Sequence, residues 1–434
     1  MIESVASFLT RHRFPLASSG RGIVDALRAD MSAKFSGDAS AWQDMTRTWL
    51  LPPEAPPKNE RVIVIDAGGT NFRSCLVSFD ADGRPTVSDF RKTAMPGVEC
   101  ELCKDDFFNT IADNIDYLKD KACRIGFCFS YSMTITEDGD GIPNAFSKEI
   151  KASEVVGCRV GATLAAVLRQ RGWNGIEHIA LLNDTVAALL AGAAGVDEGV
   201  HYSSFVGFIL GTGMNGAYIQ PQAQFGTRQV ARQIVVCENG KFGGFTRSDF
   251  DKALDAKSQH PGDYQLEKCC SGAYLGALGL ELLHTAAMER LVSDGCAQNL
   301  LRLQQLSLRE LDGFLHAPFC ADTAVAVAPV AADDRAIVYD LLDALIDRTA
   351  WYAANILTAC VVQSQAGTDA SRPVCLLCNG TTFHKTHKLR VRIESYLEQL
   401  LYRERGLAYE IVTKQDDITL GTAIAGLARI DAGT

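Results

Sequence analysis

The segment from Val62 to Val77, VIVIDAGGTNFRSCLV, constrains the fold of this chain more than any other. Four β-branched residues, Val62 to Ile65, predict a buried strand that leads into Asp66 and a glycine-rich turn. The residues after the turn predict a second strand, whereas a Walker loop or a Rossmann fingerprint needs a helix there. A Gly-Gly-Thr-Asn turn between strands offers N–H groups and a hydroxyl to phosphate, beside an acid that can hold hydrated Mg²⁺. Taken alone, the same pattern also fits an ordinary hairpin turn.

Length and charge narrow the functional classes. A chain of 434 residues with 47% hydrophobic residues predicts two or three domains, each with its own core. The net charge of −10 argues against nucleic acid or an anionic membrane as a partner, because both attract a basic face. The first twenty residues lack the apolar core of a signal peptide, and no later run has the length of a membrane span. We therefore expect a soluble, cytoplasmic protein.

The fourteen cysteines are expected to be reduced thiols in the core, because they are scattered through apolar runs in a long chain. Examples are Cys123, Cys128, Cys269, Cys270 and Cys360. A zinc site is the alternative for Cys375, Cys378, His384 and His387. It is disfavoured, because only five residues separate the two pairs and the cysteines lie in an apolar strand.

Secondary structure is predicted along the chain from periodicity and turn residues. Residues 1–48 are predicted to be helical in pieces, and residues 49–57 to form a proline-rich linker. A turn at 80–83 is predicted to lead into a third strand. Further expected elements are a helix over 105–121, a strand over 124–130, a loop over 131–150, a helix running from Val156 to near Gly172, a strand over 178–182 and a helix over 186–194.

Asp184 follows the strand over 178–182 and precedes a helix. Such a junction exposes side chains at the carboxyl edge of a sheet, so Asp184 is expected to face a crevice. The alternative is that Asp184 or Thr185 only caps the helix.

The stretch from Val206 to Gln220, VGFILGTGMNGAYIQ, repeats the plan of the first segment: a strand, a glycine turn and a strand. Two such hairpins predict a duplicated architecture, in which two similar α/β domains hold a nucleotide phosphate chain between the turns. A strand over 374–378, followed by Asn-Gly-Thr-Thr, and a small-residue helix over 420–428 support this interpretation, because small residues allow close approach.

Several motifs together resemble the hexokinase family. They are DAGGTN at 66–71, SKEIKAS at 147–153, LNDTVA at 182–187, LGTGMN at 210–215, CENGKFG at 237–243, HPGDYQLEKCCSG at 260–272 and NGTTFHKTHKL at 379–389. The resemblance extends from about Trp49 to Ala428 and is weakest between Leu283 and Ala366. It implies the two-domain actin-like (ribonuclease H-like) ATPase fold, α/β in class, with duplicated mixed sheets around a central cleft.

The resemblance also implies domains and activity. Residues 60–183 with 415–434 would form the small domain, and residues 1–59 with 184–414 the large domain. The implied reaction transfers the γ-phosphoryl group of Mg-ATP to the 6-hydroxyl of a hexose, for glycolysis. Glucose is the first choice of substrate, with mannose and fructose as alternatives, and the protein would be a monomer or homodimer.

Site residues follow from the same resemblance. Asp184 is similar to the family's catalytic base, and Lys148 would be the positive partner of the transferring group. The sugar-contacting positions are Ser130, Ser147, Lys148, Asn183, Asp184, Asn215, Glu238 and Glu267. The positions expected to contact ATP are Asp66, Gly68, Gly69, Thr70, Asn71, Arg73, Thr212, Gly213, Gly380 and Thr381, and Asp66 would reach Mg²⁺ through water.

This chain departs from the family pattern at four places. FSYSMTI at 129–135 replaces a Ser-Phe-Pro run, Ser147 stands where Thr is common, and Asn239 replaces a Trp. DDITLG at 416–421 replaces an acidic Gly-Ser-Gly pattern, which leaves the adenine contacts undefined.

These residue types suit the chemistry. Amides and carboxylates can both donate to and accept from sugar hydroxyls, and phosphoryl transfer mainly requires positioning and charge neutralisation. Without the resemblance, Lys148, Arg73 and Glu267 would read as ordinary surface charges. Two other functions stay open: a sugar sensor on the same fold that has lost turnover, and an actin-like or chaperone-type ATPase that acts on proteins.

Overall fold

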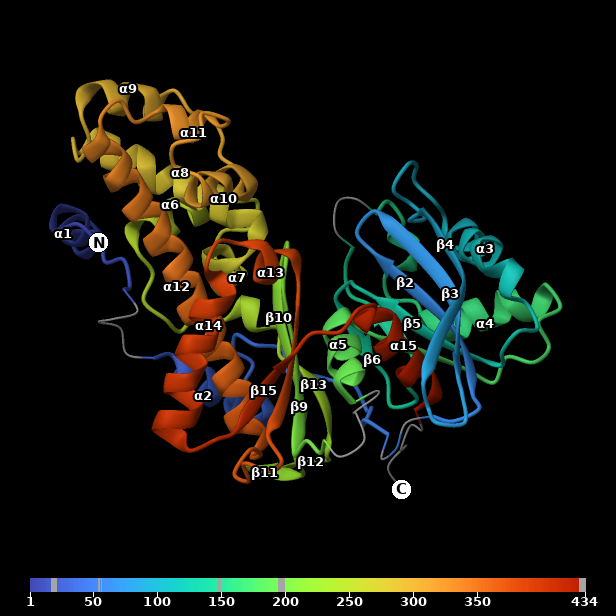
Figure 1. Ribbon diagram of the computed structural model, residues 1–434. Helices are drawn as coiled ribbons and strands as arrows, with labels where there is room; N and C mark the ends of the chain where they lie inside the picture. Colours follow the sequence, from blue (N-terminus) through green and yellow to red (C-terminus); the bar gives the residue numbers. More distant parts are fainter. Residues whose placement is uncertain (17–21, 54, 56, 147–149, 194–199, 429–434) are drawn as a thin grey trace.

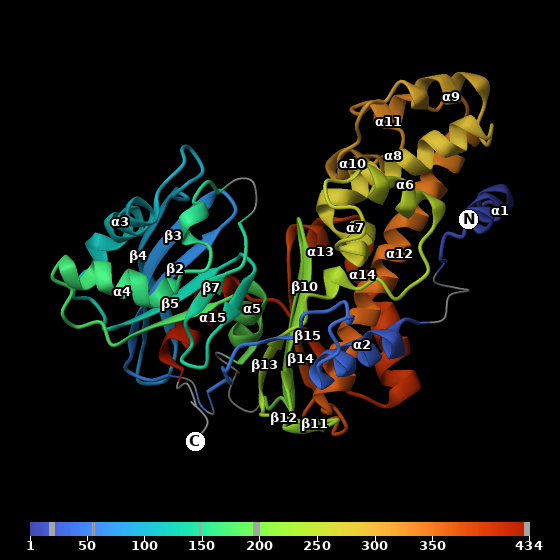
Figure 2. The same ribbon diagram turned by 180° about the vertical axis from the view of Figure 1, so that it is seen from behind.

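The computed structural model describes residues 1–16, 22–53, 55, 57–146, 150–193 and 200–428. It consists of two lobes, each built on a mixed sheet (Figure 1). The smaller lobe carries β2–β5 and β8, and the larger lobe carries the second sheet and most of the helices (Figure 2). Within the described ranges, none of the helices combines the length and apolar character that a membrane span requires.

The sheet of the smaller lobe has the strand order β4-β3-β2-β5-β8. Its first three strands form an antiparallel meander, and the last two run parallel to β2. The bounds are β2 Arg61–Gly68, β3 Asn71–Phe79, β4 Pro85–Ala94, β5 Arg124–Phe129 and β8 His178–Leu182. The predicted hairpin around the first glycine turn is therefore confirmed.

The sheet of the larger lobe repeats this plan, with the order β1-β13-β10-β9-β14-β15. Strands β9, β10 and β13 form the antiparallel meander, and β14 and β15 run parallel to β9. The bounds are β1 Thr46–Arg47, β9 Ser204–Leu210, β10 Met214–Gln220, β13 Gln233–Val236, β14 Val374–Asn379 and β15 Tyr409–Val412. The predicted duplication is confirmed by the shared strand order, to which β1 adds one edge strand.

Two helices exchange between the sheets. Helix α5 (Asp184–Ala193) follows β8 but contacts β9 of the other sheet, and α15 (Asp417–Leu427) follows β15 but contacts β5 and β2. The two helices contact each other at the junction of the lobes (Figure 1). Glycine makes this approach possible: a Cβ on Gly421 would lie 1.7 Å from the carbonyl oxygen of Ala187. We propose the domain division that the sequence predicts, with α15 in the small domain and α5 in the large one.

Helices cover the outer faces of both sheets. In the smaller lobe these are α3 (Lys104–Ile115) and α4 (Val160–Gln170). Besides α5, the helices of the larger lobe (Figure 1) are α1 Glu3–Arg11, α2 Val24–Ser36, α6 Asp249–Lys257, α7 Gln265–Cys270, α8 Gly272–Met288, α9 Asp294–Leu301, α10 Leu308–His316, α11 Ala324–Val327, α12 Ala332–Ser364, α13 Thr381–Lys385 and α14 Leu389–Leu397. The 33-residue α12 is buried over most of its length and organises the larger core.

Some predicted elements need correction. The expected loop over 131–150 contains a short hairpin of β6 (Met133–Ile135) and β7 (Gly141–Pro143). The helix predicted from Val156 begins at Val160, because Gly157 has a φ of +80° that a helix does not allow. Conversely, α5 and α15 begin two and three residues earlier than predicted, each at an aspartate.

The cysteines are all free thiols. Cys128, Cys269, Cys270 and Cys360 are buried as expected, but Cys123 is exposed, just before β5 begins. Cys375 and Cys378 are three residues apart on β14, so their side chains point to opposite faces of the sheet and cannot converge on one metal. Within the described residues, no group of three or more His, Cys, Asp and Glu side chains is arranged to hold a metal ion.

Candidate functional site

The carboxyl ends of three parallel strands meet at one edge of the small sheet. The register pairs Asp66 with Cys128 and Cys128 with Leu182, so Gly68, Ser130 and Asp184 lie two positions beyond this row. A Cβ on Gly68 would lie 2.9 Å from the Ser130 hydroxyl oxygen. The sheet therefore gathers side chains that are up to 118 residues apart in the sequence, as expected for a ligand-binding edge.

Asp184 is the first residue of α5 and faces this edge. Burial raises the pKa of its carboxyl to about 6, hydrogen bonds from Thr185 oppose the shift, and the charge of Asp66 adds to it. The Asn183 side chain caps the helix by accepting the Thr185 backbone N–H at 2.8 Å. Thr185 also packs against β9, because a Cβ on Gly207 would lie 2.3 Å from its carbonyl oxygen. Asp184 thus lies between the end of β2 and the strand that leads to the second glycine turn.

Asp66 lies at the end of β2 and is only 8% exposed. Its Oδ2 atom accepts a hydrogen bond from Arg73 Nη1 across the hairpin at 2.5 Å. The two neighbouring carboxylates, Asp66 and Asp184, concentrate negative charge that a divalent cation would offset. A buried carboxylate beside an exposed glycine turn fits Mg²⁺, which keeps several waters and binds through few carboxylates.

The amide and carboxylate groups predicted to bind sugar form a connected set on the larger lobe. Asn215 Nδ2 donates to Glu238 Oε1 at 2.8 Å, and the Glu238 backbone N–H donates back to Asn215 Oδ1 at 3.0 Å. Glu238 has a left-handed backbone, with a φ of +56°. Burial, followed by the nearby Asp44 charge, raises the pKa of its carboxyl to about 7.

Glu267 lies on α7 and completes this set. Its Oε2 atom accepts the Met214 backbone N–H at 2.9 Å, directly after the second glycine turn. Burial raises the pKa of the Glu267 carboxyl. The surface-charge interpretation of Glu267 is therefore wrong, because this carboxylate is held against the turn.

A narrow cavity joins the two lobes at this point. Asn183 from the small sheet and Glu238 from the larger lobe both line it. The remaining lining residues are Thr46, Thr48, Tyr131, Ser132, Met133, Ile135 and Val236. The two threonines and the lining role of Tyr131 were not predicted from the sequence. For Thr46 the reason is that only the pairing of β1 with β13 brings it beside the end of β13.

The second glycine turn is joined to two helix starts. The Gly211 carbonyl accepts hydrogen bonds from the Gly272 N–H and the Thr382 hydroxyl, both at 2.8 Å. The Ala273 N–H donates to the Thr212 carbonyl at 3.1 Å. Gly380, with a φ of +116°, approaches the Leu210 carbonyl so closely that a Cβ would lie 2.1 Å from it.

The four predicted ATP-contacting residues of this region, Thr212, Gly213, Gly380 and Thr381, therefore lie around one turn. The N-terminus of α8 and Asp417, which accepts a hydrogen bond from Asn379 Nδ2 at 2.6 Å, were not predicted as part of it. Thr70 and Asn71 occupy the first turn with Gly69. Ser147 and Lys148 lie outside the described residues, so their predicted roles rest on the resemblance alone.

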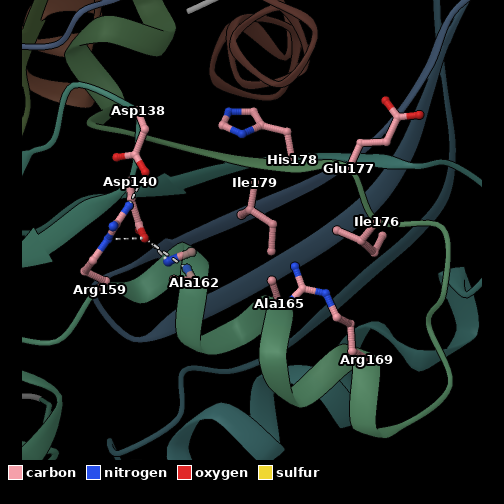
Figure 3. A pocket seen from close by; sticks show the side chains of 11 residues that line it. Asp138, Asp140, Arg159, Ala162, Ala165, Arg169, Ile176, Glu177, His178 and Ile179 are labelled. Atoms are coloured by element: carbon pink, nitrogen blue, oxygen red, sulfur yellow. Dashed lines mark hydrogen bonds and ion pairs between the residues drawn. The ribbon is translucent and has the colours of Figure 1, made fainter. Parts of the chain in front are cut away.

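A second cavity lies at the opposite end of β8. Figure 3 shows Asp140 and Arg159 in contact beside the start of α4, with His178 and Arg169 around the same space. The Asp140 carboxylate is already engaged, since it accepts the N–H groups of Gly161 and Ala162 and pairs with Arg159. None of the predicted site residues lines it, so we assign the candidate site to the cavity between the lobes.

Comparisons with known proteins agree with this geometry. Two sequence-family descriptions, both "Hexokinase", match the chain over residues 8–194 and 205–428, and the second alone covers more than half of it. Hexokinase-7 of Oryza sativa subsp. japonica is 24% identical over 98% of this chain and 97% of its own length. Hexokinase-5 of the same plant is 30% identical, over 62% of this chain and 56% of its own length.

Solved structures show the same fold. A hexokinase from Schistosoma mansoni, complexed with glucose, matches with a TM-score of 0.77 at 22% identity, over 98% of both chains. A second hexokinase crystal structure matches with a TM-score of 0.75 over 93% of both chains. The predicted two-domain actin-like fold is thereby confirmed.

Proposed function

This chain belongs to the hexokinase family and is an ATP-dependent sugar kinase, and on that premise we propose how its residues perform the transfer. Asp184 orients the 6-hydroxyl of a hexose and accepts its proton while the terminal phosphoryl group of ATP is transferred to the oxygen. The observation that carries the proposal is the position of Asp184, between the end of β2 and β9 and directly after Asn183, which lines the cavity together with Glu238.

The hexose occupies the cavity between the lobes in this proposal. Asn183, Asn215, Glu238 and Glu267 hold the ring hydroxyls, and Ser130 and Ser147 are the further residues proposed to bind the sugar. Two hydrogen bonds join Asn215 and Glu238, and a third joins the Met214 N–H to the Glu267 carboxylate. They support the proposal, because they fix these side chains before sugar binds. Glucose is the proposed substrate, with mannose and fructose as alternatives that share its 6-hydroxymethyl group.

ATP phosphates are held between the two glycine turns in this proposal. Gly68, Gly69, Thr70 and Asn71 offer donors on one side, and Thr212, Gly213, Gly380 and Thr381 on the other. Arg73 and Lys148 offset phosphate charge. Mg²⁺ supplies charge neutralisation of the phosphates when bound, and Asp66 is the residue that would hold it through water.

A panel of hexoses with ATP, against wild type and Asp184→Ala, tests the proposal. The variant is expected to bind glucose within roughly tenfold of wild type but to turn over at least about 10²-fold more slowly, because it lacks the base. Near-normal turnover in the variant would mean that Asp184 is not the base. A wild type that releases ADP at the same rate with and without any hexose would favour the protein-directed ATPase, and one that binds glucose without releasing ADP would favour the sensor.

Two further predictions accompany the function. We propose a cytoplasmic location, supported by fourteen free thiols, and cell fractionation tests it.

The oligomeric state, monomer or homodimer, stays a prediction, and light scattering would measure it.

A further inference from the structure

Tyr131 follows Ser130 directly and connects the sugar cavity with the first glycine turn. We propose that Tyr131 is a positioning residue, whose hydroxyl fixes the turn at Gly69 in the conformation that holds the ATP phosphates. The inference rests on the proposed function of that turn.

Three carbonyl groups around the turn are held from outside it. The Ala67 carbonyl accepts the Ser130 N–H, the Gly69 carbonyl accepts the Tyr131 hydroxyl, and the Thr70 carbonyl accepts the Met95 N–H, each at 3.1 Å. A carbonyl and the next N–H lie in one peptide plane and point in opposite directions. Fixing these carbonyls therefore also orients the N–H groups that a phosphate would accept.

The Tyr131 bond is the one among these three that comes from a side chain. Gly69 has a φ of +56°, and a Cβ placed on it would meet no atom within 4 Å. The tip of the turn therefore has open space around it and depends on its hydrogen bonds for a fixed orientation.

The ring of Tyr131 is held independently of its hydroxyl. The side chain is only 7% exposed, and its ring packs edge-on against Phe129 and Phe146, with centroids 4.9 and 5.2 Å away. Phe146 immediately precedes residues 147–149, which lie outside the described part of the chain. Because a phenylalanine would keep these ring contacts, the hydroxyl can be removed without emptying the site.

The same side chain also lines the sugar cavity, together with Asn183 and Glu238. A hexose in that cavity would restrain Tyr131, and through its hydroxyl the Gly69 peptide. Tyr131 thus links sugar occupancy to the geometry of the phosphate turn, because its side chain lines the cavity and its hydroxyl binds the Gly69 carbonyl.

The test is Tyr131→Phe, with initial rates measured against ATP at saturating glucose and against glucose at saturating ATP. Loss of the hydrogen bond to the Gly69 carbonyl predicts that kcat/KM for ATP falls roughly three- to tenfold. The KM for glucose is expected to stay within about twofold of wild type, because the ring still lines the cavity.

Tyr117→Phe is the matched control. The Tyr117 hydroxyl also donates to a backbone carbonyl of the same hairpin, that of Ser74 at 2.8 Å, but away from the turn. We expect wild-type kinetics for this control.

The inference is overturned if Tyr131→Phe matches wild type for ATP, or if it loses equally for both substrates along with a lowered melting temperature. The second result would mean a merely structural role. Wild-type enzyme that phosphorylates no hexose would instead contradict the proposed function, so the two failures are distinct.

Discussion

At the scale of single residues, Asp184 combines burial with a charge that catalysis requires. A raised pKa means that the folded protein favours the protonated carboxyl, whereas a base must be ionised. We therefore predict that kcat/KM for the hexose rises with pH by about tenfold per unit below pH 6 and then levels off with respect to Asp184. Initial rates at limiting hexose and saturating ATP across pH 5–8 would measure this, and a flat profile through pH 6 would contradict the assignment.

Glu238 provides the internal comparison, because the pKa of its carboxyl is raised further, to about 7. Glu238 is proposed to hold the sugar and not to take a proton from it. Its titration should therefore change the binding of glucose, whereas the limb near pH 6 belongs to Asp184.

The same pKa shift predicts a stability effect of Asp184→Asn. For a carboxyl whose pKa is raised on folding, stability is fully present below the ordinary value near 4 and is lost as pH rises through about 6. The neutral asparagine escapes this loss. The variant should melt at a higher temperature than wild type at pH 8, and the difference should vanish near pH 4, as scanning calorimetry can show. A variant that melts lower than wild type at pH 8 would mean that the buried charge is already compensated.

At the scale of elements, the crossing of α5 and α15 depends on Gly421. Because a Cβ there would lie 1.7 Å from the Ala187 carbonyl oxygen, Gly421→Ala must push the helices apart. We predict a loss of at least about 1–3 kcal/mol of unfolding free energy, measured by urea denaturation. Turnover should also fall, because α5 carries Asp184 at its start.

Gly313→Ala is the matched control for that variant. Gly313 also lies within a helix, α10, but a Cβ on it would meet no atom within 4 Å. Alanine there should stabilise the protein by about 0.5–1 kcal/mol. Equal effects of the two substitutions would show that the close helix approach is unimportant.

The contact between α12 and α6 depends on a buried ion pair. Arg348 donates two hydrogen bonds of 2.9 Å to Asp251, which also closes the capping box of α6 with Ser248. Both side chains are almost fully buried. Arg348→Met is predicted to cost about 3–5 kcal/mol, because it leaves the Asp251 charge buried without a partner.

Arg390→Met serves as the control for the ion pair. Arg390 pairs with Glu394 on the exposed side of α14, with Nε and Oε1 2.8 Å apart, so its loss should cost about 0–1 kcal/mol. Urea denaturation of both variants tests the contrast. A similar cost for both would mean that burial does not decide the strength of these pairs.

At the scale of the whole molecule, the candidate sugar site draws on both lobes, with Asn183 and Ser130 on one side and Glu238 and Glu267 on the other. A kinase must keep water from the transferable phosphate, so we predict that the lobes close when sugar binds. X-ray scattering should show a smaller radius of gyration at saturating glucose without ATP. Glu238→Ala at the same glucose concentration is the control, and an unchanged radius in wild type would contradict closure.

Local sequence specifies the central strands of both sheets, the two glycine turns and their duplication. Strings such as VIVID and VGFIL followed by glycines carry that information locally, through side-chain branching and turn preference. The family motifs also pointed to Asp184, Glu238 and Glu267, because the chemistry of a sugar site selects their types. Local patterns did not determine where helices begin, as at Val160, since Gly157 adopts a left-handed backbone that hydrophobic spacing does not reveal.

Which distant residues meet depends on how the whole chain folds. The exchange of α5 and α15, the placement of Thr46 at the cavity and the contact of Tyr131 with Gly69 arise from strand pairing and from helix packing against the opposite sheet. Such contacts join residues 62 to more than 200 positions apart, and no short sequence window contains both partners. The physical reason is that burial and backbone hydrogen bonding are satisfied by the whole fold, and site geometry follows from that solution.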